Sequence, residues 1–140
     1  MKRWLFKTDP ETYSWQDLVK VKKEVWDGVA NPLALKHLRA AAKGDAVFIY
    51  HTGAEKSVMG IGRILSAAYA SAGDASGKPS VIDLEAREAL KRPVSLAEIK
   101  SHPGLAGWEL VRFSRLSVMP VSEVQWETVL ALSRKLPLRD

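Results

Sequence analysis

The sequence predicts a small α+β domain in which a curled mixed β-sheet or open barrel has short helices packed around it. Short apolar segments rich in β-branched and aromatic residues alternate with helix-capping patterns. Their order is irregular, which argues against a doubly wound fold. The chain has 140 residues without an internal repeat, a size that can bury one core, so we expect a single domain over residues 1–140.

The first part of the chain predicts one strand and two helices. Arg3–Lys7 is β-rich and stops at a turn containing proline, which lacks the donor that a ladder needs. Ser14 and Asp17 form an approximate capping box for a short helix. Asn31 followed by proline is a strong helix start, and we expect that helix to end near Gly44.

The middle of the chain predicts strands. Ala46–His51 is an apolar, β-rich run typical of a buried strand, and Ser57–Leu65 predicts a second one with two glycines on one face. Tyr69–Ser80 is rich in Gly, Ser and Ala and predicts a flexible segment. Val81–Glu88 alternates apolar and polar residues as a half-exposed strand does, and Leu110–Val121 is also strand-like.

Two further capping boxes predict the last helices. Ser95 with a glutamate three residues later opens a short helix that ends near Pro103. Ser122 with Gln125 opens a final helix that runs through Ser133.

Composition limits the partners. The net charge is +5, which favours nucleic acid as a partner, although such a charge also serves solubility. There is no cysteine, so disulfides and thiolate metal sites are excluded. The N-terminus does not resemble a signal peptide, and no segment has the apolar length of a membrane span. We therefore expect a cytoplasmic protein with no membrane partner, and a monomer is favoured.

No cofactor or metal is expected. The glycine patterns that cradle phosphates or dinucleotides are absent. The three histidines, His37, His51 and His102, lack the spacing of a metal site.

The best candidate for a binding residue is Trp26. Asp27 and Gly28 follow it directly, and the helix start at Asn31 is near. Such a segment can bind a planar heterocycle. The flat ring stacks on it, the glycine lets the backbone approach closely, and the carboxylate and the free amides form hydrogen bonds to its edge. A core tryptophan is the competing interpretation.

Two other polar groups are candidates. Thr8 lies between Lys7 and Asp9, which makes it a possible nucleophile, although a turn needs such residues anyway. His51 ends a predicted buried strand beside Tyr50, where ligand pockets often open. A histidine that only bonds to backbone is an equal alternative at that position.

Seven motifs occur in order between Trp4 and Trp126, namely WLFKTDP, YSWQDL, WDGVANPLA, KGDAVFIYHT, VMGIGRI, RPVSLAEIK and SRLSVMPVSEVQW. Together they resemble the EVE domain family of the PUA-like superfamily, the family that includes the thymocyte nuclear protein. The resemblance implies a PUA-like fold, a curved mixed sheet that forms a pseudo-barrel. It also implies a non-catalytic module that recognises a modified base, such as a modified cytosine, in DNA or RNA through an aromatic pocket.

The resemblance also implies which residues form the site. The base-binding pocket would consist of Trp26, Asp27, Gly28, Val29, Asn31, Lys7, Thr8, Asp9, Tyr50 and His51. Lys7 and Arg115 would contact phosphate.

The chain departs from the family pattern at three places. Ala30 and Pro32 stand where relatives usually carry an arginine and an aromatic residue, and the Tyr69–Ser80 segment is shorter than usual. Two alternative functions stay open, the first because Lys7, Thr8 and Asp9 are the residue types of the ASCH amidohydrolases and the second because of these departures. One is a small amidohydrolase acting on a modified nucleoside, as in the related ASCH branch, and the other is an interaction domain with a degenerate pocket.

Overall fold

The computed structural model describes residues 1–135. Within this range the strands are β1 (Arg3–Thr8), β2 (Lys23–Trp26), β3 (Ala46–His51), β4 (Ser57–Ile64), β5 (Tyr69–Ala70), β6 (Pro79–Ser95) and β7 (Val118–Pro120). The helices are α1 (Trp15–Val21), α2 (Pro32–Ala40), α3 (Leu96–Ser101), α4 (Glu109–Arg112) and α5 (Glu123–Arg134), with a 3-10 turn η1 (Pro103–Leu105).

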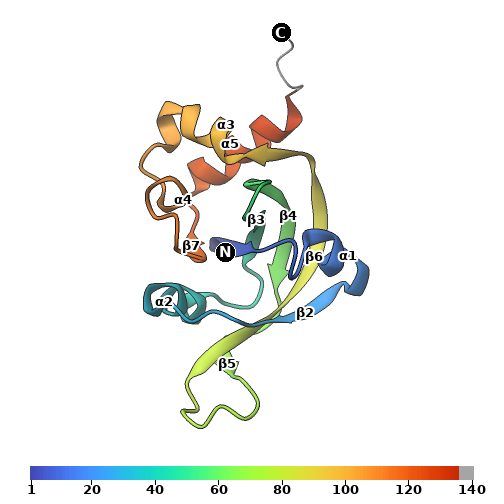
Figure 1. Ribbon diagram of the computed structural model, residues 1–140, viewed down its shortest axis with the longest axis vertical. Coiled ribbons are helices and arrows are strands. Elements are labelled where there is room, and N and C mark those ends of the chain that lie inside the picture. The colour runs from blue at the N-terminus through green and yellow to red at the C-terminus, as the bar shows by residue number, and fades with distance from the viewer. Residues whose placement is uncertain (136–140) are drawn as a thin grey trace.

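The strands form one curved mixed sheet in the order β2-β6-β4-β3-β1-β7, and β5 pairs with β6 beside this path. The β1–β3 pair is parallel, whereas the other pairs are antiparallel. Figure 1 shows β6 crossing the whole molecule, with α3, α4 and α5 grouped at one end and β5 at the other. The predicted curled mixed sheet with short helices around it is therefore confirmed.

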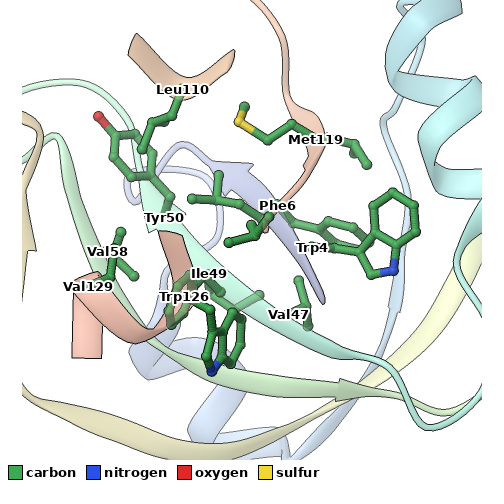
Figure 2. Packing of buried hydrophobic residues seen from close by; sticks show 14 of the residues in the cluster. Trp4, Phe6, Val47, Ile49, Tyr50, Val58, Leu110, Met119, Trp126 and Val129 are labelled. Carbon is green, nitrogen blue, oxygen red and sulfur yellow. The ribbon is translucent and has the colours of Figure 1, made fainter. Parts of the chain in front are cut away.

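The core contains all five tryptophans of the chain, which are at most 7% exposed. The rings of Phe48 and Trp126 stack with their centroids 3.7 Å apart, which fastens α5 to β3. Figure 2 shows side chains from β1, β3, β7 and α5 converging in this core. Helix α5 is thus packed against the centre of the sheet.

The two glycines of β4 accommodate close neighbours. A Cβ at Gly60 would lie 2.4 Å from Cζ2 of Trp15, and one at Gly62 would lie 2.7 Å from the Glu85 carbonyl oxygen. The α1 helix therefore packs directly on the backbone of β4.

The predicted helix starts are confirmed at atomic level. The capping boxes at Ser14, Ser95 and Ser122 are each reciprocated by the side chain three residues later. Asn31 caps α2 through its side chain, but α2 ends at Ala40 rather than near Gly44.

Two strand predictions were wrong in extent. Leu110–Val121 contains helix α4, a turn and only the short strand β7, because Trp108 and Leu110 reach the core from a helical turn. The strand predicted at Val81–Glu88 runs from Pro79 to Ser95, since its pairing with both β2 and β4 keeps the chain extended.

Residues 1–135 contain no helix that combines the length and the apolar character needed to cross a bilayer. They also contain no group of three or more potential metal ligands.

Candidate functional site

A polar turn at the end of β1 forms one wall of the candidate site. The backbone amides of Thr12 and Tyr13 both donate to the carbonyl oxygen of Asp9, at 3.0 and 2.8 Å. The hydroxyl of Thr8 donates to the carbonyl oxygen of Tyr13, so the turn folds back on the strand end. This places the Tyr13 ring beside β1.

The β2 strand forms the opposite wall. The Tyr13 hydroxyl donates to Oε2 of Glu24 at 3.0 Å, and its ring meets the Trp26 ring edge-on with the centroids 6.1 Å apart. Burial, the hydrogen bond to Glu24 and the charge of that carboxylate together raise the pKa of Tyr13 to about 12. The two walls are therefore joined by a hydrogen bond and an aromatic contact.

The two walls enclose a cleft of about 490 Å³. Its lining residues come from the β1 end, the turn and β2, namely Lys7, Thr8, Asp9, Thr12, Tyr13, Glu24, Val25, Trp26, Asp27 and Gly28. A cleft of this size is in the range of small-molecule sites.

Trp26 is a core residue and a lining residue at the same time. It is only 7% exposed, and its ring packs on Phe6 with the centroids 5.9 Å apart. Gly28 follows with φ +78°, a left-handed conformation that a side chain would strain, and it turns the chain away from the end of β2. The tryptophan is thereby held in one orientation at the edge of the cleft.

The cleft itself is acidic. Asp9, Glu24 and Asp27 line it, against the one cation Lys7. The Lys7 ammonium donates to the carbonyl oxygen of Ser114 at 3.1 Å, and burial lowers its pKa. The carboxylates of Asp9 and Asp27 lie on exposed residues, so the cleft offers hydrogen-bond acceptors to a ligand.

Six of the ten predicted pocket residues lie together in this lining, namely Lys7, Thr8, Asp9, Trp26, Asp27 and Gly28. The other four, Val29, Asn31, Tyr50 and His51, lie outside it. The predicted phosphate contact Arg115 is exposed in the segment that precedes β7.

Tyr50 and His51 end β3 and pair with Lys7 and Thr8 at the end of β1. His51 is 1% exposed, and its Nε2 accepts the backbone N–H of Trp15 at 2.8 Å, while Nδ1 faces Glu55 at 3.0 Å. This is the backbone-bonded alternative stated for that histidine. Tyr50 is 3% exposed, and burial raises its pKa to about 12.

Asn31 and Val29 connect the site to α2. The side-chain oxygen of Asn31 accepts the backbone N–H groups of Leu33 and Ala34, at 2.9 and 3.1 Å. Val29 packs half-buried against the core.

Four lining residues were not predicted, namely Thr12, Tyr13, Glu24 and Val25. Glu24 and Val25 belong to β2, which was itself missed. The signal for Tyr13 was the proline turn after β1, because such a turn reverses the chain and returns the next aromatic residue to the strand end.

A second, larger cleft of about 580 Å³ lies between α1 and β6. Its apolar lining comes from Trp15, Val19, Met59, Leu90 and Pro93. None of the predicted site residues lines it, and its polar lining includes the charged residues Lys22, Arg87 and Glu88.

The model of the EVE domain family matches residues 2–132. A protein from Rhodopseudomonas palustris, solved by NMR, superposes with a TM-score of 0.89 at 39% identity, over 95% of this chain and 93% of that one. Human thymocyte nuclear protein 1 is 30% identical, over 96% of this chain and 75% of its own length.

Human THYN1 has been crystallised in complex with DNA that contains 5-methylcytosine. It superposes with a TM-score of 0.88 at 28% identity, over 98% of this chain and 100% of that one. These matches confirm the family resemblance and the PUA-like fold.

Proposed function

The chain belongs to the EVE domain family, and from this premise we propose that it is a non-catalytic module that binds a modified cytosine in DNA. The observation that carries the proposal is the acidic cleft beside Trp26. The complex of human THYN1 with 5-methylcytosine DNA supports the same class of ligand.

The cleft offers each contact that a methylated cytosine needs. The planar ring of the cytosine can stack on an aromatic side chain of the lining, Tyr13 or Trp26. Such stacking contributes about 1–3 kcal/mol per base. The exocyclic amino group of cytosine is a donor, which a carboxylate such as Asp27 accepts. The methyl group requires an apolar contact, which Val25 supplies at the same wall, since it is 45% exposed and lines the cleft.

A base inside a duplex cannot reach such a cleft. The enzymes that act on single bases extrude the base from the stack, which costs a few kcal/mol and least where the base is unpaired. We therefore expect this chain to bind single-stranded or mismatched DNA more tightly than a fully paired duplex.

The amidohydrolase alternative has weaker support. The Thr8 hydroxyl donates a hydrogen bond to the carbonyl oxygen of Tyr13, and the Lys7 ammonium donates one to the carbonyl oxygen of Ser114. Within residues 1–135 neither group hydrogen-bonds to the other, whereas an activated nucleophile needs its base within hydrogen-bond reach.

The degenerate-pocket alternative also has weaker support. A buried Trp26 with no cleft beside it would favour this alternative. Trp26 is buried, but a cleft of about 490 Å³ lies against it.

Fluorescence anisotropy with labelled oligonucleotides tests the proposal. The set contains single-stranded DNA with one 5-methylcytosine, the unmodified strand, the duplex and the matching RNA, each at several salt concentrations. We expect the modified DNA strand to bind most tightly, with an affinity that falls as salt rises. Equal and weak binding to all four would refute the proposal. Tighter binding to the RNA would show that the partner is RNA and not DNA.

Asp27→Ala is the informative variant, because Asp27 is exposed and its removal leaves the core intact. We expect it to weaken binding of the modified and the unmodified strand alike, because both cytosines carry the exocyclic amino group that Asp27 would accept. Lys43→Ala is the control, since Lys43 is exposed in the turn before β3, at the opposite end of the sheet from the cleft.

Incubation with N4-acetylcytidine tests the amidohydrolase alternative. We expect no release of acetate. Turnover that disappears in Thr8→Ala would establish an enzyme instead.

A further inference from the structure

The segment between α4 and β7 presents an aromatic side chain and two arginines to solvent. Residues 112–115, with the sequence RFSR, are all exposed, and Phe113 is 45% exposed. The buried residues around this segment, Leu110 and Leu116, already supply its contacts to the core. Phe113 is therefore not needed for packing.

The Phe113 ring is nevertheless held in place. The guanidinium carbon of Arg112 lies over it, 5.3 Å from the ring centroid, which is within the range of a cation–π contact. The amide of Phe113 also donates to the Glu109 carbonyl oxygen at 2.7 Å, as the last bond of α4. An exposed aromatic ring at a helix end with a cation against it is a surface on which a base can stack.

This segment lies at the same end of the sheet as the cleft. Because β7 runs antiparallel to β1, the residues before β7 lie next to the residues that end β1. The amide of Lys7 donates to the Ser117 carbonyl oxygen at 2.9 Å, and the Lys7 ammonium donates to the Ser114 carbonyl oxygen at 3.1 Å. Lys7 thus belongs to the cleft and contacts the segment as well.

The charges of the two surfaces are complementary to different parts of a nucleotide strand. The cleft carries three carboxylates against one ammonium, which suits the donor edge of a base and repels phosphate. Arg112 and Arg115 are exposed and form no ion pair among residues 1–135, so both guanidinium groups are available to phosphate. A strand with one base in the cleft would therefore find its phosphates attracted to this neighbouring segment.

We propose that residues 112–115 form a second nucleic-acid contact, in which Phe113 stacks on a base next to the one in the cleft and the two arginines bind the flanking phosphates. This inference rests on the proposed function of the cleft and extends it from one base to a short strand. The occupant is thus a single-stranded segment of DNA, not a duplex, because stacking on Phe113 requires an unpaired base.

Two ligands distinguish binding at residues 112–115 from binding in the cleft. The nucleoside 5-methyl-2′-deoxycytidine can occupy the cleft alone, whereas a five-nucleotide single strand with a central 5-methylcytosine can reach both surfaces. NMR titration measures the nucleoside, and fluorescence anisotropy measures the strand.

Phe113→Ala should weaken binding of the strand by roughly 5- to 140-fold, the range that stacking on an aromatic side chain supplies, and leave nucleoside binding unchanged. Phe113→Tyr should keep the wild-type affinity because it keeps the ring, and Phe113→Leu should behave like the alanine variant. Wild-type affinity for the strand in both Phe113→Ala and Phe113→Leu would overturn the inference.

Arg112→Ala and Arg115→Ala should each reduce the salt dependence of strand binding, by about 0.7 in the slope of log K against log salt for one lost phosphate contact. Lys43→Ala should leave that slope unchanged. Unchanged slopes in both arginine variants would refute the phosphate contacts.

The outcomes also separate this inference from the proposed function. If the wild-type protein binds the strand without preferring 5-methylcytosine, the proposed function fails, while an effect of Phe113→Ala would still support the second contact. If the preference exists and the Phe113 and arginine variants keep full affinity, only the second contact fails. Absence of any binding to the strand would refute both.

Discussion

A carboxylate lies near a tryptophan beside each end of strand β1, and the two carboxylates differ in their hydrogen bonds. At the beginning of β1, Asp45 is 5% exposed and accepts three hydrogen bonds, from the Lys2 amide at 3.0 Å and from Trp4 Nε1 and the Ala42 amide at 2.9 Å. Burial works to raise its pKa, but these bonds outweigh burial, so the pKa of Asp45 lies below its usual range.

At the other end of β1, Asp27 follows Trp26 and lines the cleft. It is exposed, and its carboxylate accepts no hydrogen bond from residues 1–135. The number of hydrogen bonds that the chain donates to each carboxylate indicates whether that carboxylate stabilises the fold or can bind a ligand. An acid whose acceptor sites are filled by the chain stabilises the fold, and one whose sites are open is available to a ligand.

Replacing Trp26 should produce the largest effect on stability. Trp26→Ala should lower the free energy of unfolding by about 3–5 kcal/mol, because the indole is almost fully buried against Phe6 and Tyr13. Urea denaturation followed by circular dichroism measures this. The milder Trp26→Phe is the matched variant for binding studies. A loss below 1 kcal/mol in Trp26→Ala would mean that the residue belongs to the cleft alone.

Asp45→Asn should lower the free energy of unfolding by about 1–3 kcal/mol, because an amide cannot accept from every donor that Asp45 now satisfies. The folded-state pKa of Asp45 is lowered, so its stabilisation is present above the usual pKa and is lost as pH falls through the folded-state value. The difference from wild type should therefore shrink below about pH 4. A difference that is constant between pH 7 and pH 3 would contradict this account.

Tyr13→Phe should lower the free energy of unfolding by about 0.5–1.5 kcal/mol, through loss of its hydrogen bond to Glu24. The pKa of Tyr13 is raised to about 12, so its contribution is full below the unfolded value near 10 and is lost as pH rises towards 12. The variant should accordingly show a weaker decline of stability in this alkaline range. Denaturation curves at pH 8 and pH 11 compare the two proteins, and equal declines would refute the assignment.

Asp27→Asn should have the smallest effect, within about 0.5 kcal/mol of the wild-type stability, because its carboxylate is exposed and makes no internal bond in the described chain. The same acid-to-amide change at Asp45 is the matched comparison. A loss at Asp27 equal to the loss at Asp45 would remove the distinction between the two ends.

Local features of the chain were predictable where neighbouring residues decide them. The capping boxes and the strand β3 formed where the sequence indicated, because a cap needs only its next three residues and β3 is an apolar, β-rich run up to its last residue, His51. The helix α4 was missed, since Leu110 and its neighbours have a β-like composition but are buried in the core from a helical turn. Composition alone does not distinguish these two ways of burying the same side chains.

Some residues of the candidate site were predictable from local sequence, and others were not. The cluster of Lys7, Thr8 and Asp9 and the segment that begins at Trp26 were visible as short polar stretches beside a strand and a tryptophan. Tyr13 and Glu24 were not visible, because they meet only when the turn after β1 folds back and β2 pairs with β6. Two residues that meet only through such tertiary contacts cannot be recognised as a pair from a local sequence pattern.

The sequence by itself therefore determined the fold class, the starts of α1, α2, α3 and α5, the family and the two segments that form the cleft. Only the tertiary structure decided that these segments face one another, that His51 accepts the backbone N–H of Trp15 and that the segment before β7 lies next to the end of β1. The physical reason is that capping and apolar periodicity act within a few residues. The cleft depends on strand pairings between segments far apart in the chain, and the chain as a whole must fold before those pairings exist.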